Sequence, residues 1–153
     1  MTAPDHPDLP LKPPLVFLAA IAVGYLIGQY APMSARPAGY APAGMVLVGV
    51  AVLLAAWAAG TFRRAGTPAE PWKPTRTIVE DGPFAFSRNP IYIAFALLQV
   101  GVGIWGDRLA VVLMVIPALF VTDRVIVRRE EAYLERKFGA AYLDYKARVR
   151  RWI

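Results

Sequence analysis

Residues 43–62 form a run of twenty residues without a charged side chain. A helix of that length crosses the roughly 30 Å hydrocarbon core of a bilayer. Hydrophobic residues make up 57% of the chain and charged residues 18%, whereas a soluble domain is usually about 45–50% apolar and about a quarter charged. The sequence therefore predicts an integral membrane protein and argues against an ordinary soluble enzyme or a disordered chain.

Three further apolar stretches cover residues 15–30, 91–105 and 109–122. Asp5 and Asp8 precede the first stretch, which argues against a secretory signal because a signal starts with a positive segment. The last two stretches are short for a full span and are joined by residues 106–108 alone, so we expect them to tilt little, to thin the bilayer or to form a partly sheltered hairpin. We predict an all-α integral membrane protein with about four transmembrane helices plus a C-terminal amphipathic helix. In this single domain, 1–153, the helices cover about 14–30, 43–62, 91–105 and 109–127, with a loop at 63–90 and a C-terminal helical segment at 128–153.

The positive charges indicate an orientation. Of the 17 lysines and arginines, five lie in the 63–90 loop and nine follow Asp123. Cytoplasmic segments carry the excess of lysine and arginine, so we expect both segments and both termini on the cytoplasmic side of a bacterial inner membrane. Anionic lipid headgroups suffice to explain the net charge of +6, and no nucleic-acid partner is expected.

Several kinds of site are not expected. The chain has no cysteine and one histidine, His6, which argues against a disulfide framework, a metal centre and a Ser-His triad. Glycines at 24, 28, 101 and 103 allow close helix packing, either inside one chain or between copies. An oligomer is compatible with this pattern but not indicated by it.

The 63–90 loop contains five prolines and also apolar residues that a solvated linker would not need: Trp72, Ile78, Val79, Phe84 and Phe86. Its end indicates a shaped loop that leads into a helix. Pro90 suits the first turn of a helix, where its missing N–H costs nothing, and Ser87 or Asn89 is the expected cap. An ordinary loop with a helix-start signal explains these residues equally well.

The C-terminal segment carries an apolar stripe at helical spacing, made of Phe138, Tyr142, Tyr145, Val149 and Trp152. The same spacing runs back through Leu134 to Glu131 and Val127, and Gly139 is expected to kink or break the helix. Glu131 thus lies on an apolar face, where a carboxylate is costly unless a cation or a hydrogen bond compensates it. Two solvated glutamates beside arginines remain the plainer interpretation.

If the third and fourth helices form a hairpin, Arg88, Asn89 and Tyr92 meet Glu130 and Glu131 at its cytoplasmic end. A guanidinium binds a carboxylate, carboxylates bind an ammonium group or ribose hydroxyls, and aromatic rings bind a sulfonium or adenine. The residues alone therefore indicate a polar site for a zwitterionic cofactor at the membrane face.

These residues also resemble a known superfamily. Residues 82–92, GPFAFSRNPIY, are similar to the G-x-[FY]-x-x-x-R-[HN]-P-x-Y signature of the isoprenylcysteine carboxyl methyltransferases and phospholipid methyltransferases. Thirty-seven residues separate Tyr92 from Glu130, and the tail continues as EExxLxxxFGxxYxxY, which is again similar to the superfamily. The resemblance runs from about residue 57 to the end of the chain.

The resemblance implies a membrane methyltransferase that uses S-adenosylmethionine and releases S-adenosylhomocysteine. The acceptor would be lipophilic, either an isoprenylcysteine-like carboxylate or thiol or a lipid amine, and would enter between the helices. Asn89 stands where the best-known eukaryotic members carry histidine, so no titrating imidazole is expected there. The cofactor positions implied by the resemblance are Gly82, Phe84, Arg88, Asn89, Pro90, Tyr92, Glu130 and Glu131.

Methyl transfer mainly requires alignment and exclusion of water. We expect Arg88 and Glu131 to be catalytic, with Glu131 as the base if the acceptor is an amine. Further acceptor contacts are expected at Arg63, Arg129, Tyr142 and Tyr145. Two alternatives are an NADPH-dependent reductase of the sterol type and a non-enzymatic four-helix protein such as a transporter, although a transporter would want an acidic residue near the bilayer midplane.

Overall fold

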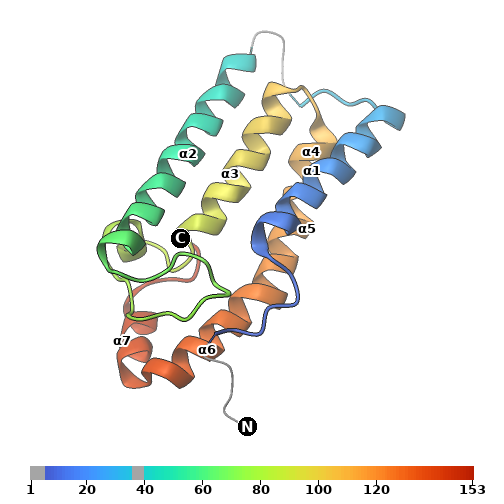
Figure 1. The fold of residues 1–153 in the computed structure, drawn as a ribbon. Helices are drawn as coiled ribbons and strands as arrows, with labels where there is room; N and C mark the ends of the chain where they lie inside the picture. The colour runs from blue at the N-terminus through green and yellow to red at the C-terminus, as the bar shows by residue number, and fades with distance from the viewer. Residues whose placement is uncertain (1–5, 36–39) are drawn as a thin grey trace.

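The structure is a computed structural model that describes residues 6–35 and 40–153, and these residues contain no β-strand. Its three long apolar helices are α1 (Pro13–Tyr30), α2 (Ala41–Arg64) and the helix Leu109–Phe138, and α3 (Pro90–Trp105) is a shorter apolar one. All four lie side by side in one bundle (Figure 1). The prediction of an all-α integral membrane protein is therefore confirmed.

The helix Leu109–Phe138 joins the predicted fourth helix and the first part of the predicted C-terminal helical segment. It consists of α4 (Leu109–Leu113), α5 (Val115–Val121), the π-helical segment η2 (Thr122–Val127) and α6 (Arg128–Phe138). At 1.5 Å per residue it is about 45 Å long, which exceeds the hydrocarbon core. The predicted fourth helix thus runs without a break into the predicted C-terminal helical segment, because charged side chains after Asp123 leave the apolar region without ending the helix.

Glycines allow the helices to approach one another closely. A Cβ atom on Gly44 of α2 would lie 2.4 Å from the backbone nitrogen of Trp105. One on Gly24 of α1 would lie 2.7 Å from the Cα atom of Val111. Gly101 and Gly103 likewise meet α2 and α4. The close packing expected from these glycines therefore takes place inside one chain.

Two ends of the bundle differ in their connections (Figure 1). The far end carries residues 31–35 and the turn 106–108, and the site end carries the N-terminal segment, the loop 65–89 and α7 (Ala140–Arg148). The short 3₁₀ helix η1 (Gly82–Ala85) lies within that loop and packs on α2.

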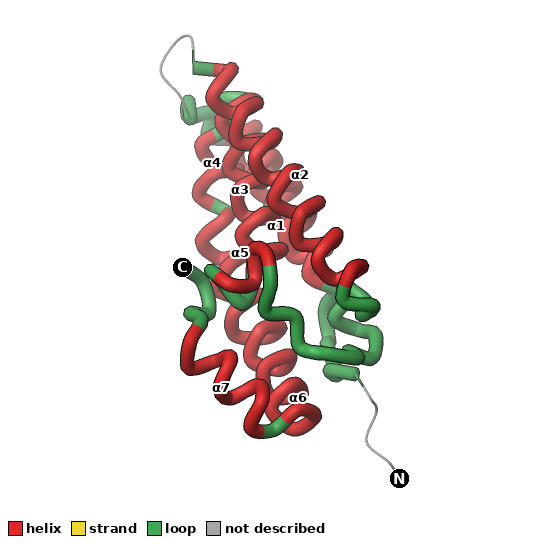
Figure 2. The backbone as a smooth tube through the Cα atoms, turned by 90° about the vertical axis from the view of Figure 1, so that its left-hand side faces the viewer, coloured by secondary structure: helices red, strands yellow, loops and turns green. Residues whose placement is uncertain are grey.

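The chain reverses at Gly139, so that α7 lies beside α6 (Figure 2). Gly139 has φ +55°, a left-handed conformation that favours glycine. Tyr142, Tyr145 and Val149 are buried there and pack with Leu134 and Phe138, so the predicted apolar stripe forms a core between two helices. At Gly139, where a kink or a break of the helix is expected, the chain therefore reverses its direction.

Candidate functional site

Arg88 reaches the site from the loop just before α3. The backbone N–H of Arg88 donates to the carbonyl of Arg150 (3.0 Å), and the Asn89 side-chain amide donates to the carbonyl of Arg151 (2.9 Å). Asn89 is the residue before α3, as expected for a cap, but its side chain makes no capping hydrogen bond. The start of α3 is instead fixed by the last residues of the chain.

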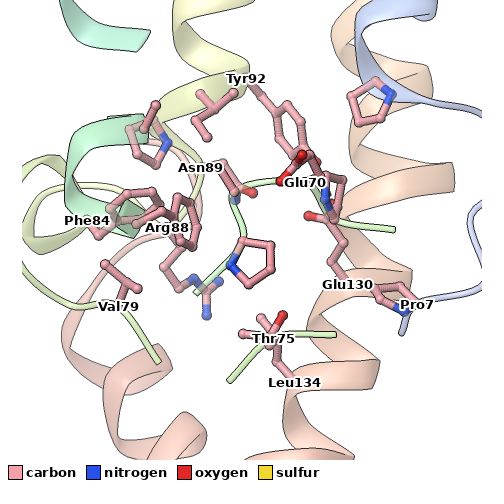
Figure 3. A pocket seen from close by; sticks show the side chains of 18 of the residues that line it. Pro7, Glu70, Thr75, Val79, Phe84, Arg88, Asn89, Tyr92, Glu130 and Leu134 are labelled. Atoms are coloured by element: carbon pink, nitrogen blue, oxygen red, sulfur yellow. Dashed lines mark hydrogen bonds between the residues drawn. The ribbon is translucent and has the colours of Figure 1, made fainter. Parts of the chain in front are cut away.

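A cavity of about 390 Å³ lies at the site end, within the usual size of ligand sites. Helices α1, α2, α3, α6 and α7 contribute to its wall together with the loop 65–89. Most of its lining side chains are apolar, and Figure 3 shows Arg88 and Glu130 on opposite sides of it. The predicted meeting of the two segments therefore takes place around a cavity.

The Arg88 guanidinium is only 8% exposed, and one of its three nitrogens pairs with Glu131, Nη2 to Oε1 at 3.0 Å. The other two, Nε and Nη1, are buried without a hydrogen-bond partner. Buried polar groups are nearly always hydrogen-bonded, and a charged group without partners costs free energy. The two nitrogens thus suit an anion that binds in the cavity.

Glu130 lies on the opposite wall, where the Tyr92 hydroxyl donates to its Oε1 at 2.5 Å. Tyr92 is buried in a cluster with Ile126 and Val127, which fixes the ring. A carboxylate and a guanidinium on facing walls can bind the two charged groups of one zwitterionic ligand.

Glu131 does not line the cavity, although it is adjacent in sequence to Glu130. Its side chain is 7% exposed and lies beside three cations: Arg88, Arg151 at 2.7 Å and Lys146 at 3.9 Å. The predicted buried carboxylate is therefore present and compensated. Hydrogen bonding to Glu131 raises the pKa of Arg151 further, so the arginine keeps its charge.

The remaining residues of the predicted cofactor set divide into two groups. Phe84, Asn89, Pro90 and Tyr92 line the cavity. Gly82 lies outside its wall, and a Cβ atom there would come within 2.8 Å of the Thr61 hydroxyl. With φ +60°, Gly82 is explained by the turn and by packing on α2.

The residues predicted to bind the acceptor also differ in position. Arg63 is exposed on α2, and Arg129 donates from Nη1 to the carbonyl of Asp8 at 3.0 Å; neither lines the cavity. Tyr142 and Tyr145 do line it. Burial raises the pKa of both hydroxyls, and Tyr145 donates to the carbonyl of Phe84 at 2.8 Å.

The sequence interpretation missed two contributions to the site. No site role is predicted for Arg151, although it binds Glu131 through two nitrogens. The N-terminal segment also contributes, because Pro7 lines the cavity. The run Arg150-Arg151-Trp152 was a usable signal for the role of Arg151, since an arginine beside the apolar stripe can reach the Glu131 carboxylate on that stripe.

Comparison with known proteins gives two matches. The family profile described as phospholipid methyltransferase matches residues 40–141, which include Arg88, Glu130 and Glu131. A curated protein of Haemophilus influenzae, described as uncharacterized, is 36% identical over 63 residues, which is 41% of this chain and all of that protein. No solved structure matches the chain.

Proposed function

Because this chain belongs to the phospholipid methyltransferase family, we propose that it transfers a methyl group from S-adenosylmethionine to a lipophilic acceptor at the membrane surface. The observation that carries the proposal is Arg88, which has two unpartnered nitrogens and lies across a largely apolar cavity from Glu130. The family supports methyl transfer, and the cavity supports the choice of cofactor.

The cavity residues fit the charged groups of this cofactor. Arg88 would hold the carboxylate, for which two buried donor nitrogens are free. Glu130 would hold the ammonium group, and Tyr142 and Tyr145 supply aromatic faces that suit a sulfonium or adenine. When bound, S-adenosylmethionine supplies a methyl carbon that its sulfonium has already activated for displacement.

The protein's own contribution is alignment and a dry site. The buried phenols of Tyr142 and Tyr145 and the loop residues around Phe84 and Val79 exclude water from one side of the cavity. Glu131 suits the positioning of Arg88 better than the role of a base, because arginines already bind both of its oxygens.

The acceptor would reach the cavity from the bilayer. Pro13 of α1, Ala55 and Ala59 of α2 and Phe95 of α3 line its apolar part. Ala55 lies nine residues before the end of α2 at Arg64, which is about 13 Å along the helix. An apolar chain entering between α1 and α2 would bring a carboxylate, a thiol or an amine toward the charged end. By the positive-inside pattern, that end is cytoplasmic.

Calorimetric titration of the detergent-purified protein with S-adenosylhomocysteine, with NADPH in parallel, tests the proposal. We expect saturable binding of S-adenosylhomocysteine alone. Arg88→Gln should weaken it about 10- to 100-fold, because hydrogen bonds to a charged group contribute about 1.5–3 kcal/mol. The matched control is Arg136→Gln, which removes an exposed arginine of α6 outside the cavity and should leave binding unchanged.

The other outcomes separate the alternatives. Binding of NADPH alone would contradict the proposal and favour a reductase. Binding of neither ligand by a folded protein would favour a protein without enzymatic activity, such as a transporter.

A further inference from the structure

The last residues of the chain lie against the start of α3 and hold it in place. The Ser87 hydroxyl and the Asn89 amide both donate to the carbonyl of Arg151, at 3.2 and 2.9 Å, and the Arg88 N–H donates to the carbonyl of Arg150. The Trp152 indole donates to Asp123 at 3.2 Å. This segment therefore fixes the backbone from which the Arg88 side chain extends.

The side chain of Arg151 adds a second link to Arg88. Its Nε and Nη2 donate to the two oxygens of Glu131 at 3.0 and 2.7 Å, and its Nη1 donates to Asp123 at 3.2 Å. Glu131 in turn pairs through Oε1 with Nη2 of Arg88. The four charges alternate in sign, from Asp123 through Arg151 and Glu131 to Arg88.

These contacts determine how many donor nitrogens of Arg88 remain free to bind a ligand. A carboxylate that has one guanidinium as its partner favours bidentate contact with it. Since Arg151 occupies both oxygens of Glu131, Arg88 makes a single contact there and keeps Nε and Nη1 without partners. Without Arg151, Glu131 would draw a second donor of Arg88 toward itself and away from the cavity.

We propose that Arg151 is a positioning residue: by binding Glu131 through two nitrogens, it keeps two donors of Arg88 directed at the carboxylate of the ligand. The inference rests on the proposed function, because it assumes a cavity ligand that carries a carboxylate. Arg151 itself does not line the cavity and acts through Glu131.

Two ligands that differ in the amino-acid group, which carries the carboxylate, test this role. S-adenosylhomocysteine carries the amino-acid group, whereas 5′-methylthioadenosine has the same adenosine thioether without it. We expect Arg151→Gln to weaken binding of S-adenosylhomocysteine about 10-fold, the equivalent of one charge-assisted hydrogen bond. Binding of methylthioadenosine should change by less than about 2-fold.

Two further variants complete the experiment. Arg150→Gln is the matched control, since the exposed neighbouring arginine contributes only its backbone carbonyl, and both affinities should stay as in the wild type. Arg151→Lys keeps the charge but loses the two-nitrogen contact, so it should recover part of the affinity for S-adenosylhomocysteine.

Equal losses for both ligands in Arg151→Gln, or an unchanged affinity for S-adenosylhomocysteine, would overturn the positioning role and leave the proposed function intact. Full recovery of the affinity for S-adenosylhomocysteine in Arg151→Lys would also overturn it, because lysine lacks the two-nitrogen contact. If the folded wild type binds neither ligand, the proposed function fails and the inference fails with it.

Discussion

The two ends of the bundle treat their polar groups differently. At the far end, Oδ1 of Asp107 accepts hydrogen bonds from the Ser34 hydroxyl (2.6 Å) and the Ala35 N–H (2.9 Å), and Arg108 donates to the carbonyl of Gly28. At the site end, Arg88 is buried with two donor nitrogens unused. At the far end, polar side chains form hydrogen bonds that connect residues 28–35 to the turn 106–108. At the site end, two donor nitrogens of Arg88 lack a partner and can bind a ligand.

The difference distinguishes structure from function. An unpartnered charged donor in a buried position costs folding free energy, so a purely structural connection has no reason to keep one. At the far end, the side chains of Asp107 and Arg108 form hydrogen bonds, as expected for a connection that contributes stability alone. Arg88 departs from that pattern, which is the physical reason to place function at its end of the bundle.

The largest expected effect is that of Glu131→Gln at the site end. Removing one partner from a buried ion pair leaves a charge uncompensated, which costs about 3 kcal/mol, and Glu131 is 7% exposed between Arg88 and Arg151. Denaturant unfolding in detergent measures the loss, and the affinity for S-adenosylhomocysteine should fall as well. Glu135→Gln, one turn later and 35% exposed, should cost much less. Wild-type stability together with wild-type affinity in Glu131→Gln would remove this residue from the site.

A smaller effect is expected from Asp107→Ala at the far end. The variant loses two hydrogen bonds and puts alanine at φ +54°, which together should cost about 2 kcal/mol of unfolding free energy. Binding of S-adenosylhomocysteine should not change, because the turn lies at the opposite end of the bundle from the loop 65–89 (Figure 1), which lines the cavity. A clear loss of affinity would break the proposed division between the two ends. Asp144→Ala, at an exposed position of α7, is the control for removing an aspartate.

The smallest effect concerns Tyr145→Phe, which should cost about 1 kcal/mol at neutral pH through the lost hydrogen bond to the Phe84 carbonyl. Because burial raises the pKa of the Tyr145 hydroxyl in the folded state, its contribution is fully present below pH 10, the unfolded value. It is lost as the pH rises above 10 toward the folded pKa. Unfolding curves at pH 8 and pH 11 should therefore show the difference between the two proteins shrinking. The exposed Tyr30, changed to phenylalanine, should show no such trend.

Much of the fold was predictable because hydropathy and membrane thickness determine it. The uncharged runs become α1, α2 and α3, and the reversal at Gly139 follows from a glycine inside an otherwise helical pattern. The sequence predicts helix after residue 127, but hydropathy does not show that α6 continues the membrane helix without a break, because a helix at the membrane surface tolerates the charges of residues 128–137. The π-helical geometry of η2 also leaves no periodic signal in so short a segment.

The site was predictable in part. The predicted hairpin of the third and fourth helices placed Arg88 near Glu130 and Glu131. The apolar stripe correctly indicated that Glu131 is a buried carboxylate. The different surroundings of Glu130 and Glu131 could not be inferred, since adjacent residues of a helix point about 100° apart and only packing shows which one meets the cavity. Whether Arg88, Glu131 and the cavity residues bind cofactor stays a prediction that the binding experiments test.

The π-helical segment η2 has a consequence for the angular phase of everything that follows it. A π-bulge accommodates one extra residue within a continuous helix, and each residue turns an α-helix by about 100°. If Thr122–Val127 wound as a regular α-helix with no residue removed, α6 would turn about its own axis by about 100°. Glu130 and Glu131 would then rotate as a pair away from Tyr92 and Arg88, with their composition and spacing unchanged. The winding of this short segment thus sets the direction in which both carboxylates point.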